Sequence, residues 1–314
     1  MDADDQTRWL TSEIGLIDLH FQGMPRVIGA YLLPTSDGLA LIECGPTTTL
    51  DALETGIRSL GHDLADVRHV LVTHIHLDHA GAAGVLLDRL PGAQLYVHEI
   101  GAPHMIDPTN LVRSAARIYG DRMDQLWGEI RPVPADRVVV VADNEIVSIG
   151  GRTLRAMYTP GHASHHIAYH DEEARLIFVG DVAGVRIPPA IEVWPPTPPP
   201  DVDIVGWHAS IARLRAANPD RMLLTHFGPW DDVSPHLDQL GARLDQWVAL
   251  VEQWAIDGLD RDAMIARLGA VVLEEMGRNG TSDLAPMFEL TTPHWMSIDG
   301  LLRFLRKQGR IPQP

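Results

Sequence analysis

Short apolar runs separated by turn-forming residues make up most of the chain before residue 230. Runs of about four to eight apolar or β-branched residues, bounded by Gly, Pro, Asn or Asp, are typical of β-strands. We therefore expect strands at residues 14–21, 27–33, 39–43, 67–73, 94–98, 138–141, 146–149, 153–158, 167–169, 176–179 and 221–224. These strands fall into two series, one on each side of a long segment with helical spacing.

Apolar residues at helical spacing occur between these strands. Residues 47–49 can cap a helix that continues to about Leu60, with Leu50, Leu53 and Ile57 on its buried face. Further helices are expected at residues 81–89, 100–128 and 205–217, the second of them interrupted by prolines.

The pattern changes beyond Pro229, where only helical spacing remains. One long amphipathic helix is expected, and its apolar stripe comprises Leu237, Leu240, Leu244, Trp247, Val248, Val251 and Trp254. A second helix is expected over 260–276, with Asp260 as its N-cap and Gly277 just past its end. A third begins at Thr292, where a capping residue precedes a proline, and continues to about residue 308.

These patterns predict a chain of two parts. Residues 1–229 are expected to form an α+β domain, and residues 230–314 a helical extension that supplies a substrate pocket or a lid. The sequence WPPTPPP at residues 194–200 excludes a helix or a central strand, because proline lacks the amide donor. We expect a rigid surface crossover there, and a partner-binding polyproline segment is the alternative.

Composition narrows the classes of function. The chain has 314 residues, with 42 acidic and 25 basic side chains and a net charge of −17. Because such a charge repels polyanions, we expect a small-molecule substrate and no nucleic-acid or membrane partner. Cys44 is the only cysteine, which excludes an intrachain disulfide. We expect it to be a small buried hydrophobe at a strand end, although a ligand or nucleophile is the alternative.

The N-terminal sequence, MDADDQTRWL, lacks the basic and apolar regions of a signal peptide. No apolar stretch approaches the length needed to cross a bilayer. We therefore expect a soluble, cytoplasmic protein. The sequence does not specify the oligomeric state, and a homodimer is compatible with it.

Residues 71–84, LVTHIHLDHAGAAG, contain the densest group of candidate metal ligands. His74, His76, Asp78 and His79 follow an apolar strand and precede a helix, so we place them on a strand-to-helix loop. In an extended segment the side chains at i and i+2 point the same way, so His74 and His76 can bind one metal ion. Asp78 and His79 follow the turn and suit a second ion. A polar surface loop with several histidines is the alternative.

Three further candidates, His162, Asp181 and His226, each lie at or just after the end of a predicted strand. The order HxHxDH, then His, then Asp, then His resembles the two-metal members of the metallo-β-lactamase superfamily. The resemblance covers about residues 10–230. It implies an αββα sandwich with the metal ions at one edge, between two β-sheets.

The resemblance also implies a role for each candidate ligand. The first metal would be held by His74, His76 and His162, the second by Asp78, His79 and His226, and Asp181 would bridge both. Imidazole and carboxylate ligands suit two divalent ions, Zn²⁺ above all, with Fe or Mn as alternatives. A metal-bridging hydroxide would be the nucleophile, and Asp78 would be the proton acceptor beside it.

The implied activity is that of a metal-dependent hydrolase acting on an ester, thioester or lactone. The helical tail is similar to that of hydroxyacylglutathione hydrolases (glyoxalase II), although Lys307 is the only lysine and the glutathione-binding residues of that family find no counterpart. A phosphodiesterase or nuclease is disfavoured by the acidic charge. A single-iron sulfur dioxygenase would need only the first set of ligands, and a non-enzymatic binding module would be expected to lack one of the seven.

Four other residues are weaker candidates. Arg186 is a candidate for binding a substrate carboxylate with its planar guanidinium, and an ordinary ion pair is the alternative. His165, His166 and His170 crowd the ligand His162. We expect them to alternate along a surface strand, and orientation of a metal ligand is the alternative.

Overall fold

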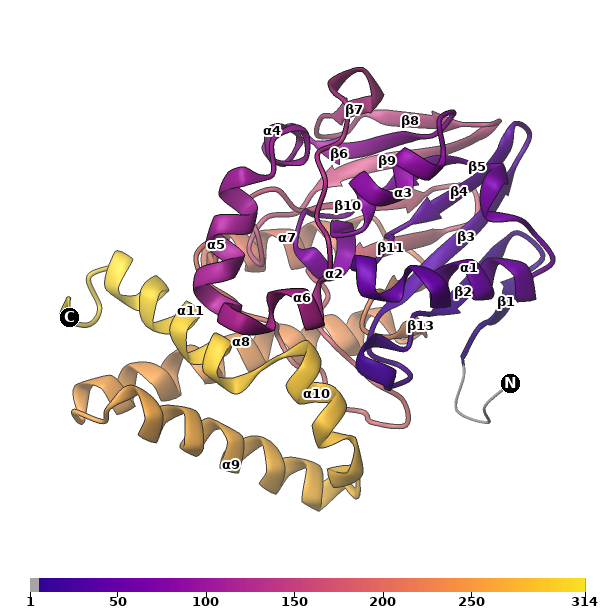
Figure 1. Ribbon diagram of the computed structural model, residues 1–314. Coiled ribbons are helices and arrows are strands. Elements are labelled where there is room, and N and C mark those ends of the chain that lie inside the picture. Colours follow the sequence, from indigo (N-terminus) through magenta and orange to yellow (C-terminus); the bar gives the residue numbers. More distant parts are fainter. Residues whose placement is uncertain (1–5, 314) are drawn as a thin grey trace. The chain divides into compact units, whose positions relative to one another are not determined.

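The structure, a computed structural model, describes residues 6–313 (Figure 1). The internal contacts of the chain divide it into two compact units. The N-terminal unit extends to Tyr158 and includes the segment His165–Val179. The C-terminal unit comprises Thr159–Ser164 and everything from Gly180 onward.

The first sheet belongs to the N-terminal unit and has seven strands among the described residues. They are ordered along the sheet as in the chain: β1 (Arg8–Thr11), β2 (Ile14–Asp18), β3 (Gly29–Thr35), β4 (Gly38–Ile42), β5 (Val67–Leu71), β6 (Gln94–His98) and β7 (Val138–Val141). Neighbours are antiparallel up to β4 and parallel from β4 to β7. Strands β4, β5 and β6 are buried almost throughout, as is usual for parallel strands covered on both faces.

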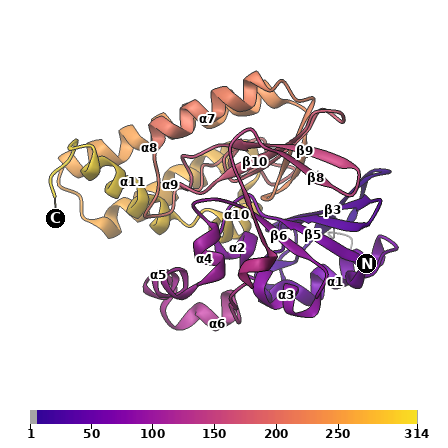
Figure 2. The same cartoon turned by 90° about the horizontal axis from the view of Figure 1, so that it is seen from above.

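The N-terminal unit also contains four strands of a second, antiparallel sheet: β8 (Ile146–Ile149), β9 (Arg152–Tyr158), β10 (Ile167–Asp171) and β11 (Leu176–Gly180). They face the first sheet (Figure 2). The ring of Tyr31 on β3 lies 5.3 Å from that of Phe178 on β11, and the Tyr169 hydroxyl donates to the Val72 carbonyl over 3.2 Å. Such an aromatic pair contributes about 0.5–1.5 kcal/mol beyond burial of its area. The core of this unit therefore lies between the two sheets.

The α-helices of the N-terminal unit are α1 (Leu50–Ser59), α2 (Leu77–Ala80), α3 (Ala83–Arg89), α4 (Ala102–Ile106), α5 (Thr109–Tyr119) and α6 (Met123–Leu126). Figure 2 shows α1 and α3 on the side of the first sheet away from β8, β9 and β10. The predicted face of α1, with Leu50, Leu53 and Ile57, is buried. Gly56 permits close packing there, because a Cβ atom at this position would lie 2.3 Å from Ile17 Cγ2. The α+β class with two sheets is thereby confirmed.

The C-terminal unit is mainly helical. It contains α7 (Ile204–Ala216), β12 (Arg221–Leu224), β13 (Gly228–Trp230), α8 (Val233–Ile256), α9 (Arg261–Asn279), α10 (Ala285–Thr291) and α11 (His294–Lys307). In Figure 1 helices α8, α9 and α11 lie together, and α11 contacts both of the others. Every residue of the predicted α8 stripe is buried. The assignment of 1–229 and 230–314 as separate domains stays a prediction.

The end of α9 differs from the prediction. Asp260 is the N-cap, as expected, and its carboxylate accepts a hydrogen bond from the Ala263 amide over 2.8 Å. Gly277, however, lies inside the helix, and the left-handed residue that ends it is Gly280, with φ 73°. Both are glycines near the end of the same apolar stripe, and only the backbone conformation distinguishes them.

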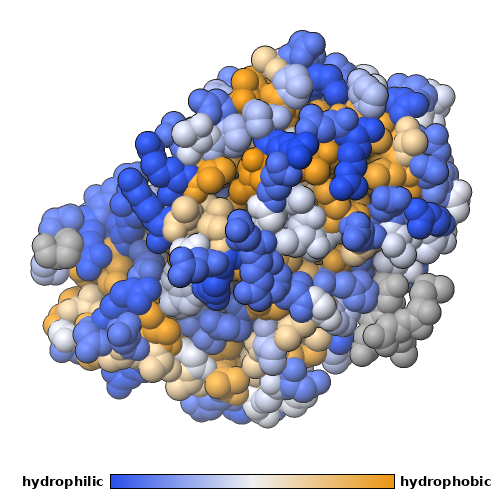
Figure 3. Space-filling model, in the orientation of Figure 1, coloured by the Kyte–Doolittle hydropathy of each residue, from blue (hydrophilic) through white to orange (hydrophobic). Residues whose placement is uncertain are grey.

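The hydropathy of the surface and of the helices is relevant to possible membrane contact. Hydrophilic residues cover most of the face drawn in Figure 3. Within residues 6–313, no helix is both long enough and apolar enough to cross a bilayer. Cys44 is fully buried, as expected, and burial raises the pKa of its thiol above the usual range.

Candidate metal centre

The histidine-rich segment begins where β5 ends. The placement of all four candidates on a loop was wrong for Asp78 and His79, which lie in the single turn of α2, with His76 as its N-cap. The amides of His79 and Ala80 donate to the His76 carbonyl over 3.1 and 2.9 Å and so close this turn. A helix of four residues is too short to produce an apolar periodicity, so the sequence pattern did not indicate it.

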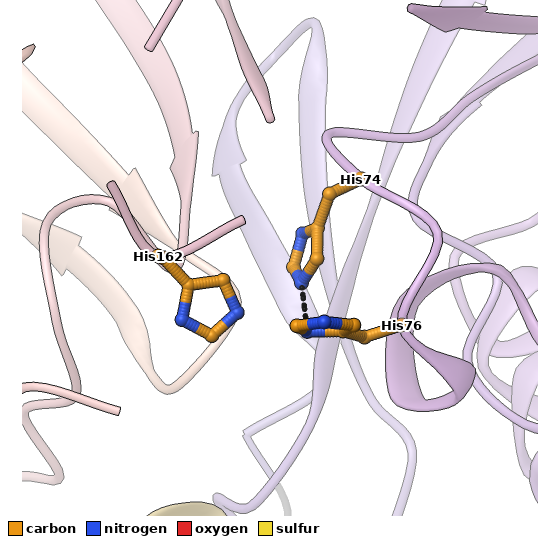
Figure 4. A group of neighbouring side chains, drawn as sticks. All are labelled: His74, His76 and His162. Carbon is orange, nitrogen blue, oxygen red and sulfur yellow. Dashed lines mark hydrogen bonds between the residues drawn. The ribbon is translucent and has the colours of Figure 1, made fainter. Parts of the chain in front are cut away.

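The rings of His74 and His76 lie close together. The Nε2 atom of His74 lies 3.0 Å from Nδ1 of His76 (Figure 4). The ring of His79 lies beside that of His74, with centroids 3.9 Å apart. Nε2 of His79 is 3.6 Å from the Asp78 carboxylate. The segment thus gathers three imidazoles and one carboxylate within the N-terminal unit.

Glu43, a buried residue that the sequence pattern did not indicate, contacts this group through hydrogen bonds. The Glu43 side chain is fully buried and follows the end of β4. Its Oε1 atom accepts from the Thr73 hydroxyl over 2.5 Å and lies 3.1 Å from Nδ1 of His79. The Thr73 oxygen in turn lies 3.1 Å from Nδ1 of His74. Glu43 also has a positive φ of 66°, which is uncommon outside glycine and asparagine.

These hydrogen bonds fix which nitrogen of each ring carries a proton. An ionised carboxylate only accepts hydrogen bonds, so Nδ1 of His79 is the donor to Glu43. Because the Thr73 hydroxyl donates its proton to Glu43, its oxygen accepts from Nδ1 of His74. Nε2 is therefore the nitrogen with a lone pair for a metal in both rings, which is the usual arrangement when a second group orients a histidine ligand.

The C-terminal unit brings together the other three candidates. Nε2 of His162 lies 3.3 Å from one carboxylate oxygen of Asp181, and Nε2 of His226 lies 3.4 Å from the other. Nδ1 of His162 donates to the Pro196 carbonyl over 2.7 Å, so Nε2 is again the nitrogen with the lone pair. The side chains of all three candidates are buried. A carboxylate with one histidine at each oxygen is the arrangement expected of a group that bridges two metal ions.

All seven candidates occur in groups whose potential ligand atoms lie within 4.8 Å of one another. These groups are His74, His76 and His162 (Figure 4); Asp78, His79 and His226; and His74, His79 and Asp181. Five members are buried, whereas His76 and Asp78 are half-buried. Neutral imidazoles with two carboxylates suit divalent metal ions, so the residues present fit such ions.

Arg186 has partners of its own in the C-terminal unit. Its Nη1 atom donates to both carboxylate oxygens of Asp232 over 3.0 and 2.9 Å, and its guanidinium carbon lies 3.7 Å from the centre of a Trp230 ring. Its backbone amide donates to the His226 carbonyl over 2.7 Å. These contacts are those of an ion-paired arginine beside a ligand, and binding of a substrate carboxylate by Arg186 stays a prediction.

The expectation of a surface strand for His165, His166 and His170 was wrong. His166 is fully buried, and the other two are less than one tenth exposed. Only His170 lies on β10, which pairs with β9 and β11, whereas His165 and His166 precede this strand. Nδ1 of His165 accepts from the Ile75 amide over 3.4 Å, and the ring of His166 is centred 5.0 Å from that of His74. Burial lowers the pKa of His170.

His236, a further buried histidine, is hydrogen-bonded to the segment that follows Asp181. Nε2 of His236, on α8, donates to the Ala183 carbonyl over 2.7 Å. Burial is the main cause that lowers the pKa of His236 to about 4, and the nearby Arg186 adds to the effect. The hydrogen bond to Ala183 and the charge of Asp232 act in the opposite direction. His236 is therefore neutral in the folded protein across the ordinary pH range.

This burial predicts that acid destabilises the fold. An unfolded histidine has a pKa of about 6.5, so the unfolded chain takes up a proton between pH 6.5 and 4 that folded His236 excludes. The stabilisation is present above pH 6.5 and falls as the pH approaches 4, by about 3 kcal/mol at most. Urea unfolding of the chelator-treated protein at several pH values should show this slope, and His236→Gln should reduce it. If the free energy of unfolding of His236→Gln depends on pH as strongly as that of the wild type, His236 is not the cause of the acid destabilisation.

Comparison with known proteins agrees with this geometry. The family model of the metallo-beta-lactamase superfamily matches residues 24–226, which is more than half of the chain. The chain therefore belongs to the metallo-beta-lactamase superfamily. A metallo-beta-lactamase family protein of Thermus thermophilus has the same fold, with a TM-score of 0.66 over 96% of this chain and 95% of that one, at 21% identity. The expected fold class with its C-terminal helical region is confirmed.

Relatives identified by sequence cover the chain less completely. A metallo-beta-lactamase fold-containing protein of Sulfurisphaera tokodaii is 28% identical over 193 residues, 60% of this chain and 71% of that protein. A hydroxyacylglutathione hydrolase of Synechococcus is 30% identical over 48% of this chain and 47% of the enzyme. An atrochrysone carboxyl ACP thioesterase of Aspergillus fumigatus is 31% identical over 36% of this chain, and the match spans only 26% of the enzyme. Together with the His/Asp cluster, these similarities support a metal-dependent hydrolase in general.

Proposed function

We propose that this protein is a binuclear metal-dependent hydrolase that cleaves an ester, thioester or lactone. The observation that carries the proposal is the set of seven candidate ligands, with Asp181 between His162 and His226. A carboxylate with further candidate ligands on both sides of it suits two metal ions. A lost ligand would be the expected sign of a binding module, and a one-metal dioxygenase would need only the first set.

Each residue has a place in this proposal. His74, His76 and His162 would hold the first ion, Asp78, His79 and His226 the second, and Asp181 both. When bound, zinc ions, or iron or manganese in their place, would activate a water molecule and polarise the substrate carbonyl. Asp78 is half-buried and adjacent to His79, and in this proposal its carboxylate would accept the proton of the attacking water.

A thioester is the substrate class that we favour. The named relatives include a hydroxyacylglutathione hydrolase and an acyl carrier protein thioesterase, and both names denote thioester cleavage. The chain itself has a net charge of −17, which disfavours the phosphate backbone of a nuclease substrate. A glyoxalase II-like enzyme is therefore part of the proposal, with the identity of the thiol left to experiment.

We also propose that the helices after Trp230 contribute to substrate binding. Within the C-terminal unit, His236 of α8 and Asp232, the N-cap of this helix, contact the segment after Asp181. The ring of Trp194 stacks on that of Trp247 of α8, with centroids 5.9 Å apart. Apolar side chains carried by these helices suit an apolar acyl group better than a phosphate chain.

The test of the proposed function is the metal content together with a substrate screen. Protein reconstituted with zinc is expected to hold two ions per chain by elemental analysis, and His226→Ala about one. His208→Ala is the matched control, because His208 is a half-exposed residue of α7 that pairs with Asp245. Hydrolysis of thioesters, lactones, β-lactams and phosphodiesters should be measured in parallel. A reconstituted wild-type protein that holds one ion, or that cleaves only phosphodiesters, would overturn the proposal.

A further inference from the structure

The turn that carries His162 is packed directly onto α7. Gly161 has φ +136°, and a Cβ atom at this position would lie 2.4 Å from Cα of Trp207. The Gly161 carbonyl accepts from the Asp203 amide over 2.9 Å, and the Pro160 carbonyl accepts from the Ser210 hydroxyl over 2.6 Å. Helix α7 therefore determines where the backbone of His162 lies within the C-terminal unit.

The side chain of Trp207 connects this turn to the segment that carries Asp181. Trp207 is fully buried, and the ring of His162 packs edge-on against it, with centroids 5.7 Å apart and planes at 80°. The indole N–H donates to the Val182 carbonyl over 2.7 Å. Val182 directly follows Asp181. The Trp207 side chain therefore contacts both His162 and the segment that carries Asp181.

We propose that Trp207 is a positioning residue for the metal centre, one that sets the separation between His162 and Asp181. The proposal rests on the metal-binding function proposed above. The Pro196 carbonyl holds Nδ1 of His162 while Trp207 covers a side of the same ring, so the imidazole can neither flip nor turn away. The indole hydrogen bond limits the movement of the Asp181 segment relative to that ring.

A large buried aromatic residue can also serve packing alone, and Trp247 provides the comparison. Trp247 is equally buried, lies on α8 of the same unit and stacks on another tryptophan. Within the described residues its indole nitrogen has no hydrogen-bond partner. Substitution with phenylalanine removes a similar volume at both positions, but only Trp207→Phe removes a bond to the segment of a proposed ligand.

The test compares the metal affinities of wild type, Trp207→Phe and Trp247→Phe by zinc competition with a chromophoric chelator. Groups that orient metal ligands typically change affinity by roughly 10–100-fold when they are replaced. We therefore expect about tenfold weaker binding in Trp207→Phe and wild-type affinity in Trp247→Phe. The visible spectrum of the cobalt-substituted protein should change in Trp207→Phe alone. Wild-type affinity and spectrum in Trp207→Phe would overturn the proposal.

A second variant covers the case in which Trp207→Phe does not fold. Replacement of Trp207 by β-(3-benzothienyl)alanine keeps the shape of the indole and removes only the N–H donor. Weaker zinc binding in this protein supports the positioning role, and unchanged binding overturns it. A wild-type protein that binds no metal would instead refute the proposed function itself, so the two failures are distinguishable.

Discussion

Asp78→Asn is expected to lower the turnover number of the zinc-loaded enzyme by about 10²–10⁴-fold, the usual contribution of a general base. Asparagine has nearly the same shape as aspartate but cannot accept a proton. Asp78 is one of the two candidate ligands that are half-buried, so its carboxylate reaches the solvent from which water and substrate arrive. The fold should be retained, because the α2 turn is closed by backbone hydrogen bonds to His76.

The measurement is the turnover number with a thioester from the screen, at equal metal content in both proteins. Asp88→Asn is a suitable control, because Asp88 lies on α3, is exposed and pairs with Arg131. It should leave turnover unchanged. If metal-replete Asp78→Asn retains near-normal turnover, Asp78 is not the proton acceptor.

The sequence was most informative where chemistry and strand ends coincide. His74, His162 and His226 each follow an apolar run, and the structure gathers all of them into groups of candidate ligands. Their position just past predicted strand ends carried this information, because the loops that follow strands are where such folds usually carry their chemistry. Glu43 follows a strand in the same way. A single glutamate beside Cys44, however, gave no spacing signal, and its partners Thr73 and His79 are distant in sequence.

Two differences between the predicted and the observed strands have physical explanations. Strand β13 consists of Gly228, Pro229 and Trp230, a composition that favours turns, and it exists through pairing with β12. Strand β7 was expected to begin the second series of strands, yet it pairs in parallel with β6 of the first sheet. Hydrophobic pattern identifies a strand but not its neighbour, because pairing is decided by tertiary contacts.

Glu43→Gln is expected to weaken metal binding by about 10–100-fold, as is usual when a group behind a histidine ligand is replaced. The Glu43 carboxylate accepts bonds from the Thr73 hydroxyl and from Nδ1 of His79. Glutamine would present an amide N–H₂ to one of these donors, and a buried donor without an acceptor costs about 1–3 kcal/mol. The two imidazoles would then lose both their fixed orientation and the negative charge behind them.

Two further variants test whether the expected loss of metal affinity comes from the hydrogen bonds that Glu43 makes near the candidate ligands. Glu192→Gln is the matched control, because Glu192 is an equally buried glutamate whose carboxylate accepts from Asn279 and Thr281 and from no candidate ligand. It should lower the free energy of unfolding without changing metal affinity. Thr73→Val removes the hydroxyl that lies between Glu43 and His74 but keeps the contact of Glu43 with His79. It should therefore weaken the first metal more than the second, whereas Glu43→Gln weakens both. Zinc affinities measured by chelator competition distinguish a role of Glu43 in metal binding from a role in folding. A wild-type affinity in Glu43→Gln would show that Glu43 serves the fold alone.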